Sequence, residues 1–247
     1  MTITAPPAPR VLVVEDDEST AEAVAFHLRA AGLDPALAPD GLTALRALHN
    51  NPPDIVLLDL MLPGIDGWHL IRQTREWAPT LPIIVVTART NEHDRVEVLA
   101  LGADDVVGKP FSMRELTARV KAALRRVAAT GAGPAPEPVR EGELVIDPER
   151  MTATMAGRPV DLTPLEFTLL WTLADGRERV LSRDDIFRAV WGRERAHGDR
   201  SVDVLVRRLR RKVDEVNGEF TYIQTVHGIG YRFRATPRRM PGTLPPA

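Results

Sequence analysis

The stretch VLVVEDDEST, residues 11–20, places four apolar residues directly before four acidic ones. A short apolar run that is rich in β-branched residues and bounded by polar ones predicts an interior strand. The acids then lie just beyond the carboxyl end of that strand, which is where open parallel sheets bind their ligands. We therefore expect a parallel sheet with a charged site at one rim.

Further apolar runs alternate with helix-like stretches through the first half of the chain. The strand candidates are DIVLLDL at 54–60 and PIIVVTA at 82–88, with weaker ones in DPALA at 34–38 and DDVVG at 104–108. Helical periodicity marks STAEAVAFHLRAAG at 19–32, GLTALRALHN at 41–50 and FSMRELTARVKAALRR at 111–126. This alternation predicts an α/β domain with a doubly wound, five-stranded parallel sheet of the flavodoxin kind.

Composition limits the class of protein. The 247 residues are enough for two domains, 44% of them are hydrophobic, and the net charge is −2. The absence of cysteine excludes disulfides, thiolate metal sites and cysteine nucleophiles. No stretch approaches the length of a membrane span, and the start MTITAPPAPR lacks the features of a signal peptide. We therefore expect a cytoplasmic protein with no membrane partner.

The stretch AATGAGPAPEPVREG, residues 128–142, separates two halves of different charge. Small residues, glycine and proline cannot form a core, so this stretch predicts a tether. We expect an α/β domain at residues 10–127, a linker at 128–140, a second domain at 141–237 and flexible tails at 1–9 and 238–247. The first half carries a charge of about −4 and the second about +3, which indicates different partners.

Five polar side chains fall at strand ends of the first domain. Glu15 and Asp16 follow the first strand, Asp59 and Thr87 end the next two apolar runs, and Lys109 follows DDVVG. Because the carboxyl ends of parallel strands share one edge, we expect these side chains to converge. Clustered carboxylates repel one another, and a hard divalent cation such as Mg²⁺ relieves that repulsion. Taken singly, Glu15 or Asp17 is typical of a helix N-cap or a solvated turn, Thr87 of a β-branched strand residue and Lys109 of a surface lysine. Asp59 departs from such an interpretation, because a carboxylate at the end of an apolar run is costly without a partner.

The second half predicts a smaller domain of strands and helices. GELVIDPERMTATMAGRPVDLT at 142–163 alternates apolar and polar residues around turns, which is typical of short antiparallel strands. Helix signals follow in TPLEFTLLWTLADG at 163–176, which opens with a capping box, SRDDIFRAVWG at 182–192 and RSVDVLVRRLRRKVDEV at 200–216. FTYIQTVHGIGYRFR at 220–234 predicts a hairpin around a glycine-bearing turn.

The third of these helices has one apolar and one basic face. The apolar face should pack on the core, and it consists of Val202, Val206, Leu209 and Val213. The opposite face carries Arg200, Val204, Arg207, Arg208 and Arg211. Arginine fits DNA phosphates and guanine edges, and an exposed valine can meet a thymine methyl group. The alternative is a solvated basic face that is paired with Asp203 and Asp214.

Four motifs follow one another in the first half, namely VLVVEDD at 11–17, DIVLLDLMLPGIDG at 54–67, IIVVTAR at 83–89 and LGADDVVGKPF at 101–111. Together they resemble the receiver domain of two-component response regulators. The resemblance implies a CheY-like fold in which Asp59 accepts a phosphoryl group from a phosphohistidine of a sensor histidine kinase. It implies that Glu15, Asp16, Asp59 and the backbone carbonyl of Met61 hold Mg²⁺. Lys109 would offset the charge of the phosphoryl group, and Thr87 would donate its hydroxyl to it.

One position departs from the pattern of these receivers. They usually carry tyrosine or phenylalanine where this chain has Val106, and Gly108 is also less usual. The aromatic ring swings inward when the threonine moves, and valine lacks that lever arm. An alternative function is therefore a DNA-binding transcriptional regulator that does not depend on phosphorylation.

Three motifs in the second half are LTPLEFTLL at 162–170, DRSVDVLVRRLRRKV at 199–213 and VHGIGYRF at 226–233. They resemble the α+β winged-helix DNA-binding domain of the OmpR/PhoB subfamily. By position, the resemblance implies that Arg208 contacts bases of double-stranded DNA. It implies that the helix is positioned, or the DNA backbone contacted, by Arg200, Ser201, Asp203 and Arg210. His227 stands where the wing of the family often places an arginine in the minor groove.

The resemblance also implies a receiver dimer, in which Arg95 pairs with Glu115 and Asp105 with Arg119. We therefore predict a response regulator that is phosphorylated on Asp59, dimerises, binds promoter half-sites and acts with RNA polymerase to control transcription. An enzyme is the alternative from another class, because an aspartate-nucleophile phosphohydrolase uses similar acids. Such an enzyme needs a second acid where this chain has Met61, so we do not expect an enzyme.

Overall fold

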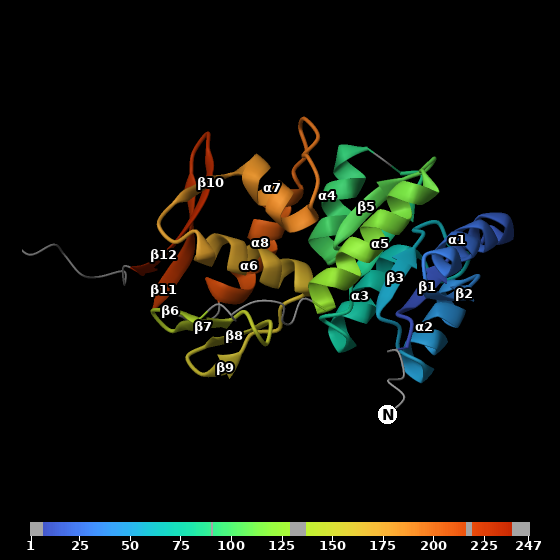
Figure 1. Ribbon diagram of the computed structural model, residues 1–247, viewed down its shortest axis with the longest axis horizontal. Helices are drawn as coiled ribbons and strands as arrows, with labels where there is room; N and C mark the ends of the chain where they lie inside the picture. The colour runs from blue at the N-terminus through green and yellow to red at the C-terminus, as the bar shows by residue number, and fades with distance from the viewer. Residues whose placement is uncertain (1–6, 90, 129–136, 216–218, 239–247) are drawn as a thin grey trace, which may run out of the picture. The chain divides into compact units, whose positions relative to one another are not determined.

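The computed structural model describes residues 7–89, 91–128, 137–215 and 219–238 (Figure 1). The chain splits into two compact units, residues 1–129 and 130–247. The centre of the predicted linker, residues 129–136, lies outside the described residues, as do residues 1–6 and 239–247 of the predicted tails. Helix α5 ends at Ala128 and strand β6 begins at Val139, two residues before the predicted start of the second domain.

The first unit is built on a five-stranded parallel sheet with the strand order β2-β1-β3-β4-β5. Its strands are β1 (Arg10–Val14), β2 (Asp34–Ala38), β3 (Ile55–Leu58), β4 (Ile83–Thr87) and β5 (Asp105–Gly108). Each of them was predicted from the sequence, the two weak candidates included. This strand order is that of the flavodoxin-like doubly wound fold, so the predicted fold class is confirmed.

Helices cover both faces of this sheet. They are α1 (Glu18–Ala30), α2 (Gly41–Asn50), α3 (Gly67–Trp77), α4 (Glu92–Leu101) and α5 (Met113–Ala128). Leu28 of α1 and Val120 of α5 share a buried cluster with every second strand residue, such as Val13 and Ile84. Helices α2, α3 and α4 contact one another in sequence along the opposite face. Periodicity had not identified α3 and α4.

The third acid of the opening stretch is a helix cap. Asp17 is the N-cap of α1, and its side chain accepts a hydrogen bond of 2.7 Å from the backbone of Thr20. Hydrogen bonds from Thr20 and Ser19 lower the pKa of Asp17 to about 2. The ordinary alternative for an acid after a strand is therefore correct for this residue, which leaves Glu15 and Asp16 for the rim.

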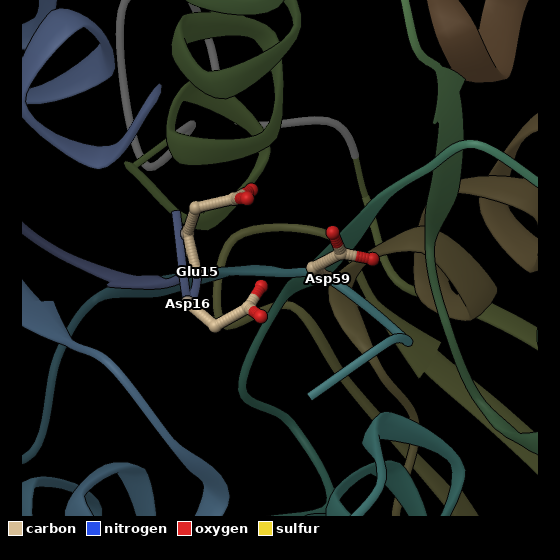
Figure 2. Close-up of side chains that lie close together, drawn as sticks. All are labelled: Glu15, Asp16 and Asp59. Carbon is tan, nitrogen blue, oxygen red and sulfur yellow. The ribbon is translucent and has the colours of Figure 1, made fainter. Parts of the chain in front are cut away.

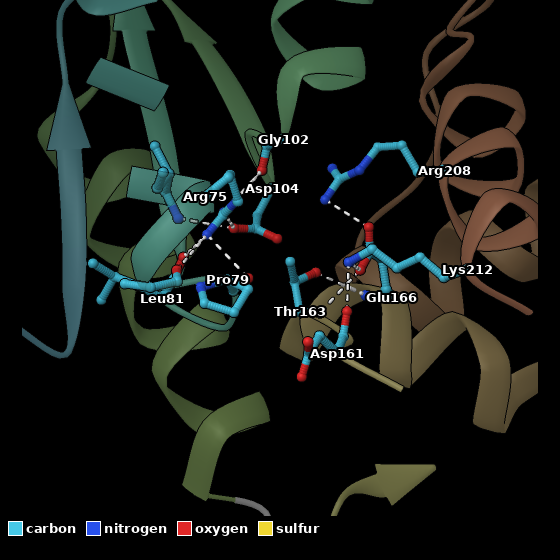
Figure 3. A network of polar contacts seen from close by, with 12 residues as sticks. Arg75, Pro79, Leu81, Gly102, Asp104, Asp161, Thr163, Glu166, Arg208 and Lys212 are labelled. Atoms are coloured by element: carbon cyan, nitrogen blue, oxygen red, sulfur yellow. Dashed lines mark hydrogen bonds and ion pairs between the residues drawn. The ribbon is translucent and has the colours of Figure 1, made fainter. Parts of the chain in front are cut away.

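The amino-terminal edge of the sheet is held by Arg75, near the end of α3 (Figure 3). Its guanidinium donates to the carbonyl oxygens of Gly102 and Leu81, and it lies 2.9 Å from a carboxylate oxygen of Asp104. That same oxygen accepts a hydrogen bond of 2.8 Å from the backbone of Ile83. These bonds tie the end of α3 to the starts of β4 and β5.

Within its described residues, 137–215 and 219–238, the second unit contains two small antiparallel sheets and three helices. The first sheet has the order β6-β7-β8-β9, with β6 (Val139–Glu141), β7 (Leu144–Asp147), β8 (Thr152–Met155) and β9 (Arg158–Pro159). The helices are α6 (Pro164–Asp175), α7 (Arg183–Trp191) and α8 (Ser201–Val213). The second sheet, β10-β12-β11, consists of β10 (Val180–Ser182), β11 (Phe220–Val226) and β12 (Gly230–Pro237). Strand β10 was not predicted.

Helix caps and one core hold this unit together. Thr163 and Glu166 form the predicted capping box at the start of α6, with Pro164 in the first turn. The core joins the helices to the terminal hairpin, and it includes Leu169, Phe187, Leu209, Tyr222 and Phe233. The predicted hairpin is confirmed as β11 and β12, and its turn has exposed residues at 227–229.

Gly230 has no room for a side chain. A Cβ atom at this position would lie 2.0 Å from the carbonyl oxygen of Leu181 on the paired strand β10. We expect Gly230→Ala to lower the free energy of unfolding of this unit by about 2 kcal/mol, the typical effect of overpacking. Urea unfolding of the full chain measures it. Gly176→Ala is the control, since its φ angle is −85° and a Cβ there would come no closer than 3.5 Å to its neighbours, and an equal loss in both variants would contradict the steric argument.

Candidate functional site

Three acidic side chains meet at the carboxyl edge of the parallel sheet (Figure 2). Glu15 and Asp16 follow β1 and Asp59 follows β3, and each offers an oxygen within 4.8 Å of the others. The backbone N–H of Asp59 donates to the carbonyl of Val14 at 2.9 Å, which sets the two strand ends side by side. Glu15 and Asp59 are only 6% and 5% exposed, whereas Asp16 is exposed. The predicted convergence of these acids is confirmed.

Lys109 brings a cation to the same rim from the end of β5. Its Nζ atom lies 2.7 Å from Glu15 Oε2 and 2.6 Å from Asp59 Oδ2. Burial lowers the pKa of Lys109, but the hydrogen bonds and charges of Asp59 and Glu15 outweigh burial, so the net shift is upward. Burial raises the pKa of Glu15, and Lys109 offsets this effect only in part. One ammonium group therefore faces three acids.

Thr87 and Met61 complete the surroundings of Asp59. Thr87 is fully buried at the end of β4, where its carbonyl accepts a hydrogen bond of 2.8 Å from the backbone of Lys109. The hydroxyl oxygen of Thr87 accepts from the backbone of Arg89 at 3.2 Å. The backbone N–H of Met61 donates to Asp59 Oδ1 at 3.0 Å. The Lys109–Pro110 peptide bond is cis, which no feature of the sequence had indicated.

The donor set at this rim suits a hard divalent cation. All three acids present oxygen atoms, and such atoms are the ligands that Mg²⁺ prefers. The ammonium of Lys109 already bridges two of the carboxylates, which indicates that a positive charge is stable at this place. The residues present therefore fit Mg²⁺.

A stripe of residues on α8 faces outward in the second unit. Arg207 and Arg211 are exposed and Val204 is half-buried between them and Arg200, which is exposed at the N-cap of the helix. Their spacing of three or four residues aligns them on one face. These four members of the predicted basic face lie where it was expected.

Arg208 does not lie on this exposed face. It is 6% exposed, and its guanidinium lies 2.8 Å from Glu166 Oε1, while Lys212 Nζ lies 2.7 Å from Glu166 Oε2 (Figure 3). The prediction that Arg208 is on the exposed face is therefore wrong. Burial raises the pKa of Glu166, but the charges of Arg208 and Lys212 outweigh it, so the pKa lies below its ordinary value. The buried carboxylate draws both cations inward.

Three more of the predicted DNA-binding residues have partners inside the unit. Ser201 is buried. Asp203 accepts a hydrogen bond from Arg183 of α7 at 2.9 Å, and Arg210 donates to the carbonyl of Ile223 at 2.8 Å. The alternative to DNA binding was a solvated basic face on this helix, paired with Asp203 and Asp214. Asp203 does pair with an arginine, but that arginine belongs to α7 and not to the basic face of α8.

Comparisons with known proteins identify the family of the chain. The response regulator receiver domain matches residues 11–121, and the C-terminal domain of transcriptional regulatory proteins matches residues 157–233. The transcriptional regulatory protein BaeR of Escherichia coli is 40% identical over 239 residues, which are 94% of this chain and 95% of BaeR. The phosphate regulon transcriptional regulatory protein PhoB of Klebsiella pneumoniae is 40% identical over 230 residues, which are 92% of this chain and 99% of PhoB. The chain belongs to the OmpR/PhoB family of response regulators.

Solved structures place this response regulator in the same group. DrrB, an OmpR/PhoB homologue of Thermotoga maritima, shares 28% identity at a TM-score of 0.50, over 92% of this chain and 99% of DrrB. A mutant of RitR reaches a TM-score of 0.71 at 27% identity, again over 92% of this chain and 99% of that one. Within the residues that the structure describes, no helix of this response regulator is both long and apolar enough to cross a membrane.

The residues predicted for the dimer interface of the response regulator lie on α4, β5 and α5. Arg119 lies 2.6 Å from Asp105 and 2.5 Å from Glu115 of its own chain. Burial lowers the pKa of Arg119, and the two carboxylates raise it above its ordinary value. Arg95 is on α4. The pairing of these four residues across two chains stays a prediction.

Proposed function

We propose that a sensor histidine kinase phosphorylates this response regulator on Asp59, and that phosphorylation promotes receiver dimerisation and binding to paired DNA half-sites. The observation that carries the proposal is the setting of Asp59. This carboxylate is nearly buried, it lies 2.6 Å from the ammonium of Lys109, and two other acids share its rim. Buried carboxylates that lie so close to one another are costly, and such clusters are typical of sites that bind a charged ligand or carry out a reaction.

The residues of the rim have distinct parts in the transfer. A carboxylate oxygen of Asp59 attacks phosphorus, so an O–P bond forms as the N–P bond to the kinase histidine breaks. Glu15, Asp16, Asp59 and the carbonyl of Met61 would hold Mg²⁺, which when bound neutralises charge on the phosphoryl oxygens. Lys109 holds a second positive charge beside Asp59.

Thr87 is the residue that can report phosphorylation to the rest of the receiver. Its hydroxyl belongs to a fully buried side chain at the end of β4. A hydrogen bond from this hydroxyl to a phosphoryl oxygen forms only when Asp59 is phosphorylated. A contact that exists in one state alone shifts the equilibrium between two conformations, here toward the dimer-forming one with Arg95, Asp105, Glu115 and Arg119 at the interface.

The second unit supplies the DNA contacts. Arg200, Arg207 and Arg211 present exposed guanidinium groups along one face of α8, and Val204 lies among them. This arrangement suits phosphates, guanine edges and a thymine methyl group in the major groove. His227 in the turn between β11 and β12 would meet the neighbouring minor groove. Bound at a promoter in the cytoplasm, the dimer would act on RNA polymerase.

A second candidate function rests on Val106. This residue is 5% exposed on β5, at the position where the resemblance to receivers led us to expect an aromatic ring. A buried valine has no long side chain to rotate, so a regulator that binds DNA without phosphorylation is the alternative. The relatives are transcriptional regulators, and we therefore infer regulation and not the chemistry of a phosphohydrolase.

The deciding experiment measures operator affinity at fixed salt, with and without acetyl phosphate and Mg²⁺, on DNA selected from a random pool. We expect phosphorylation to tighten binding about tenfold or more, equivalent to about 1.4 kcal/mol, because two linked DNA-binding domains raise each other's effective concentration. Asp59→Ala is the matched variant and should not respond. Equal affinities in all samples would support the phosphorylation-independent alternative.

A further inference from the structure

Tyr231 of β12 occupies the centre of a polar cluster in the second unit. The side chain is 4% exposed, and its hydroxyl donates a hydrogen bond to Asp203 of α8. The guanidinium of Arg183 lies 5.1 Å from the ring centroid, and that of Arg210 lies 5.6 Å from it. Both distances permit a cation–π interaction. One ring therefore contacts α7 and α8 through three charged side chains.

Arg210 extends this cluster to the other strand of the hairpin. Its guanidinium donates to the carbonyl of Ile223 at 2.8 and 3.2 Å and to the hydroxyl of Thr225 at 2.8 Å. Arg183 lies 2.9 Å from Asp203, so the far side of the cluster is fixed to α7. Both strands of the hairpin are thus bound to α8, two residues before and after the exposed turn at 227–229.

The ionisation states agree with this arrangement. Burial and the hydrogen bond to Asp203 raise the pKa of Tyr231 to about 12. Burial raises the pKa of Asp203, but the bonds from Arg183 and Tyr231 outweigh it, and the pKa falls below its ordinary value. At neutral pH the hydroxyl is protonated and the carboxylate ionised, so each bond keeps its donor and its acceptor.

We propose that Arg183, Asp203, Arg210 and Tyr231, here called the helix–wing strut, position the wing relative to α8. The inference rests on the proposed DNA-binding function. Of the two roles that the resemblance implied for Asp203 and Arg210, it assigns positioning and not contact with the DNA backbone, and it names the wing as the part that they position. Arg210 is a positioning residue, because its Nε and Nη2 groups donate to Ile223 and Thr225 of the hairpin. With the strut intact, α8 and the turn at His227 are held at one fixed spacing and engage adjacent grooves together.

The test is a double-mutant cycle between Arg210 and His227. Operator affinity is measured over a range of salt at one fixed pH, for the phosphorylated full chain, Arg210→Gln, His227→Ala and the double variant. We expect Arg210→Gln to weaken binding about tenfold without changing the salt slope. In that background, His227→Ala should weaken binding less than it does in the unaltered chain, because the wing is no longer held in place.

Arg211→Gln is the control, since Arg211 is exposed on the same helix. The loss of a phosphate contact lowers the salt slope by about 0.9, which is the result expected for Arg211→Gln. A similar drop for Arg210→Gln would show that Arg210 contacts a DNA phosphate. Effects of Arg210→Gln and His227→Ala that simply multiply would show that Arg210 acts independently of the wing. Either result would overturn the strut.

A second measurement needs no DNA and separates this inference from the proposed function. Backbone amides of β11 and β12 near the turn should exchange with deuterium about tenfold faster in Arg210→Gln than in Arg211→Gln. Tyr231→Phe, which removes only the hydroxyl, should act in the same direction. Unchanged exchange in both variants rejects the strut even where DNA binding is intact. Faster exchange without any DNA binding keeps the strut and rejects the proposed function.

Discussion

Lys109→Met is expected to lower the free energy of unfolding of the receiver by about 3 kcal/mol in the absence of Mg²⁺. The ammonium lies within 2.7 Å of both Glu15 and Asp59, and these two acids are nearly buried. Without it, three carboxylates share one rim and no ammonium group bridges two of them. Methionine keeps most of the length and volume of the side chain, so the loss reports charge and not packing.

Mg²⁺ provides the second half of this experiment. The variant rim is more negative by one charge, so added Mg²⁺ should stabilise Lys109→Met more than it stabilises the unaltered chain. Urea unfolding with and without the metal measures both effects. Lys121→Met, at an exposed position of α5, is the matched control and should change neither. If Mg²⁺ stabilises all three proteins equally, the acids do not form its site.

Glu166→Ala is expected to destabilise the second unit by about 3 to 5 kcal/mol. Glu166 accepts from the backbone of Thr163 at 2.9 Å and neutralises Arg208 and Lys212, all at a fully buried position. Alanine removes the capping bond and the charge together. Glu166→Gln retains an acceptor for Thr163 and should lose less, so urea unfolding of both variants separates the two contributions.

The charge of Glu166 also predicts a pH dependence. Its pKa in the folded chain lies below the ordinary value of 4.5, so the folded state favours the ionised form. The stabilisation is therefore complete above about pH 4.5 and is lost as the pH falls through the folded pKa. The difference in unfolding free energy between the unaltered chain and Glu166→Gln should shrink over that acidic range. A difference that stays constant down to pH 3 would contradict the ion pairs.

The sequence predicted the sheet and the rim because both follow from local patterns. Apolar runs such as IIVVT specify buried strands, and the parallel arrangement brings their carboxyl ends together, so Glu15, Asp59 and Lys109 had to meet. Helix α3 was missed because GWHLIRQTREW contains few apolar residues, and β10 because it has only three residues. Neither segment has a pattern that is visible without its neighbours.

The burial of Arg208 could not be predicted from the sequence. On the helix its neighbours three residues away are Leu205, which is buried, and Arg211, which is exposed, so it lies at the border between the two faces. Helical periodicity cannot assign a border residue to either face. The deciding partner, Glu166, belongs to another helix, and only the packing of α6 against α8 brings the two together.

The inward cations of α8 bear on how this regulator would search a genome. Of the basic cluster Arg207–Lys212, Arg208, Arg210 and Lys212 are held by groups inside the unit. Under the proposed function, few counterions would then be released when a single copy meets arbitrary DNA, so we expect its non-specific association to be weak and brief. Such a protein would not be sequestered by the vast excess of wrong sites, and two copies together would gain proportionately more from a correct pair of half-sites.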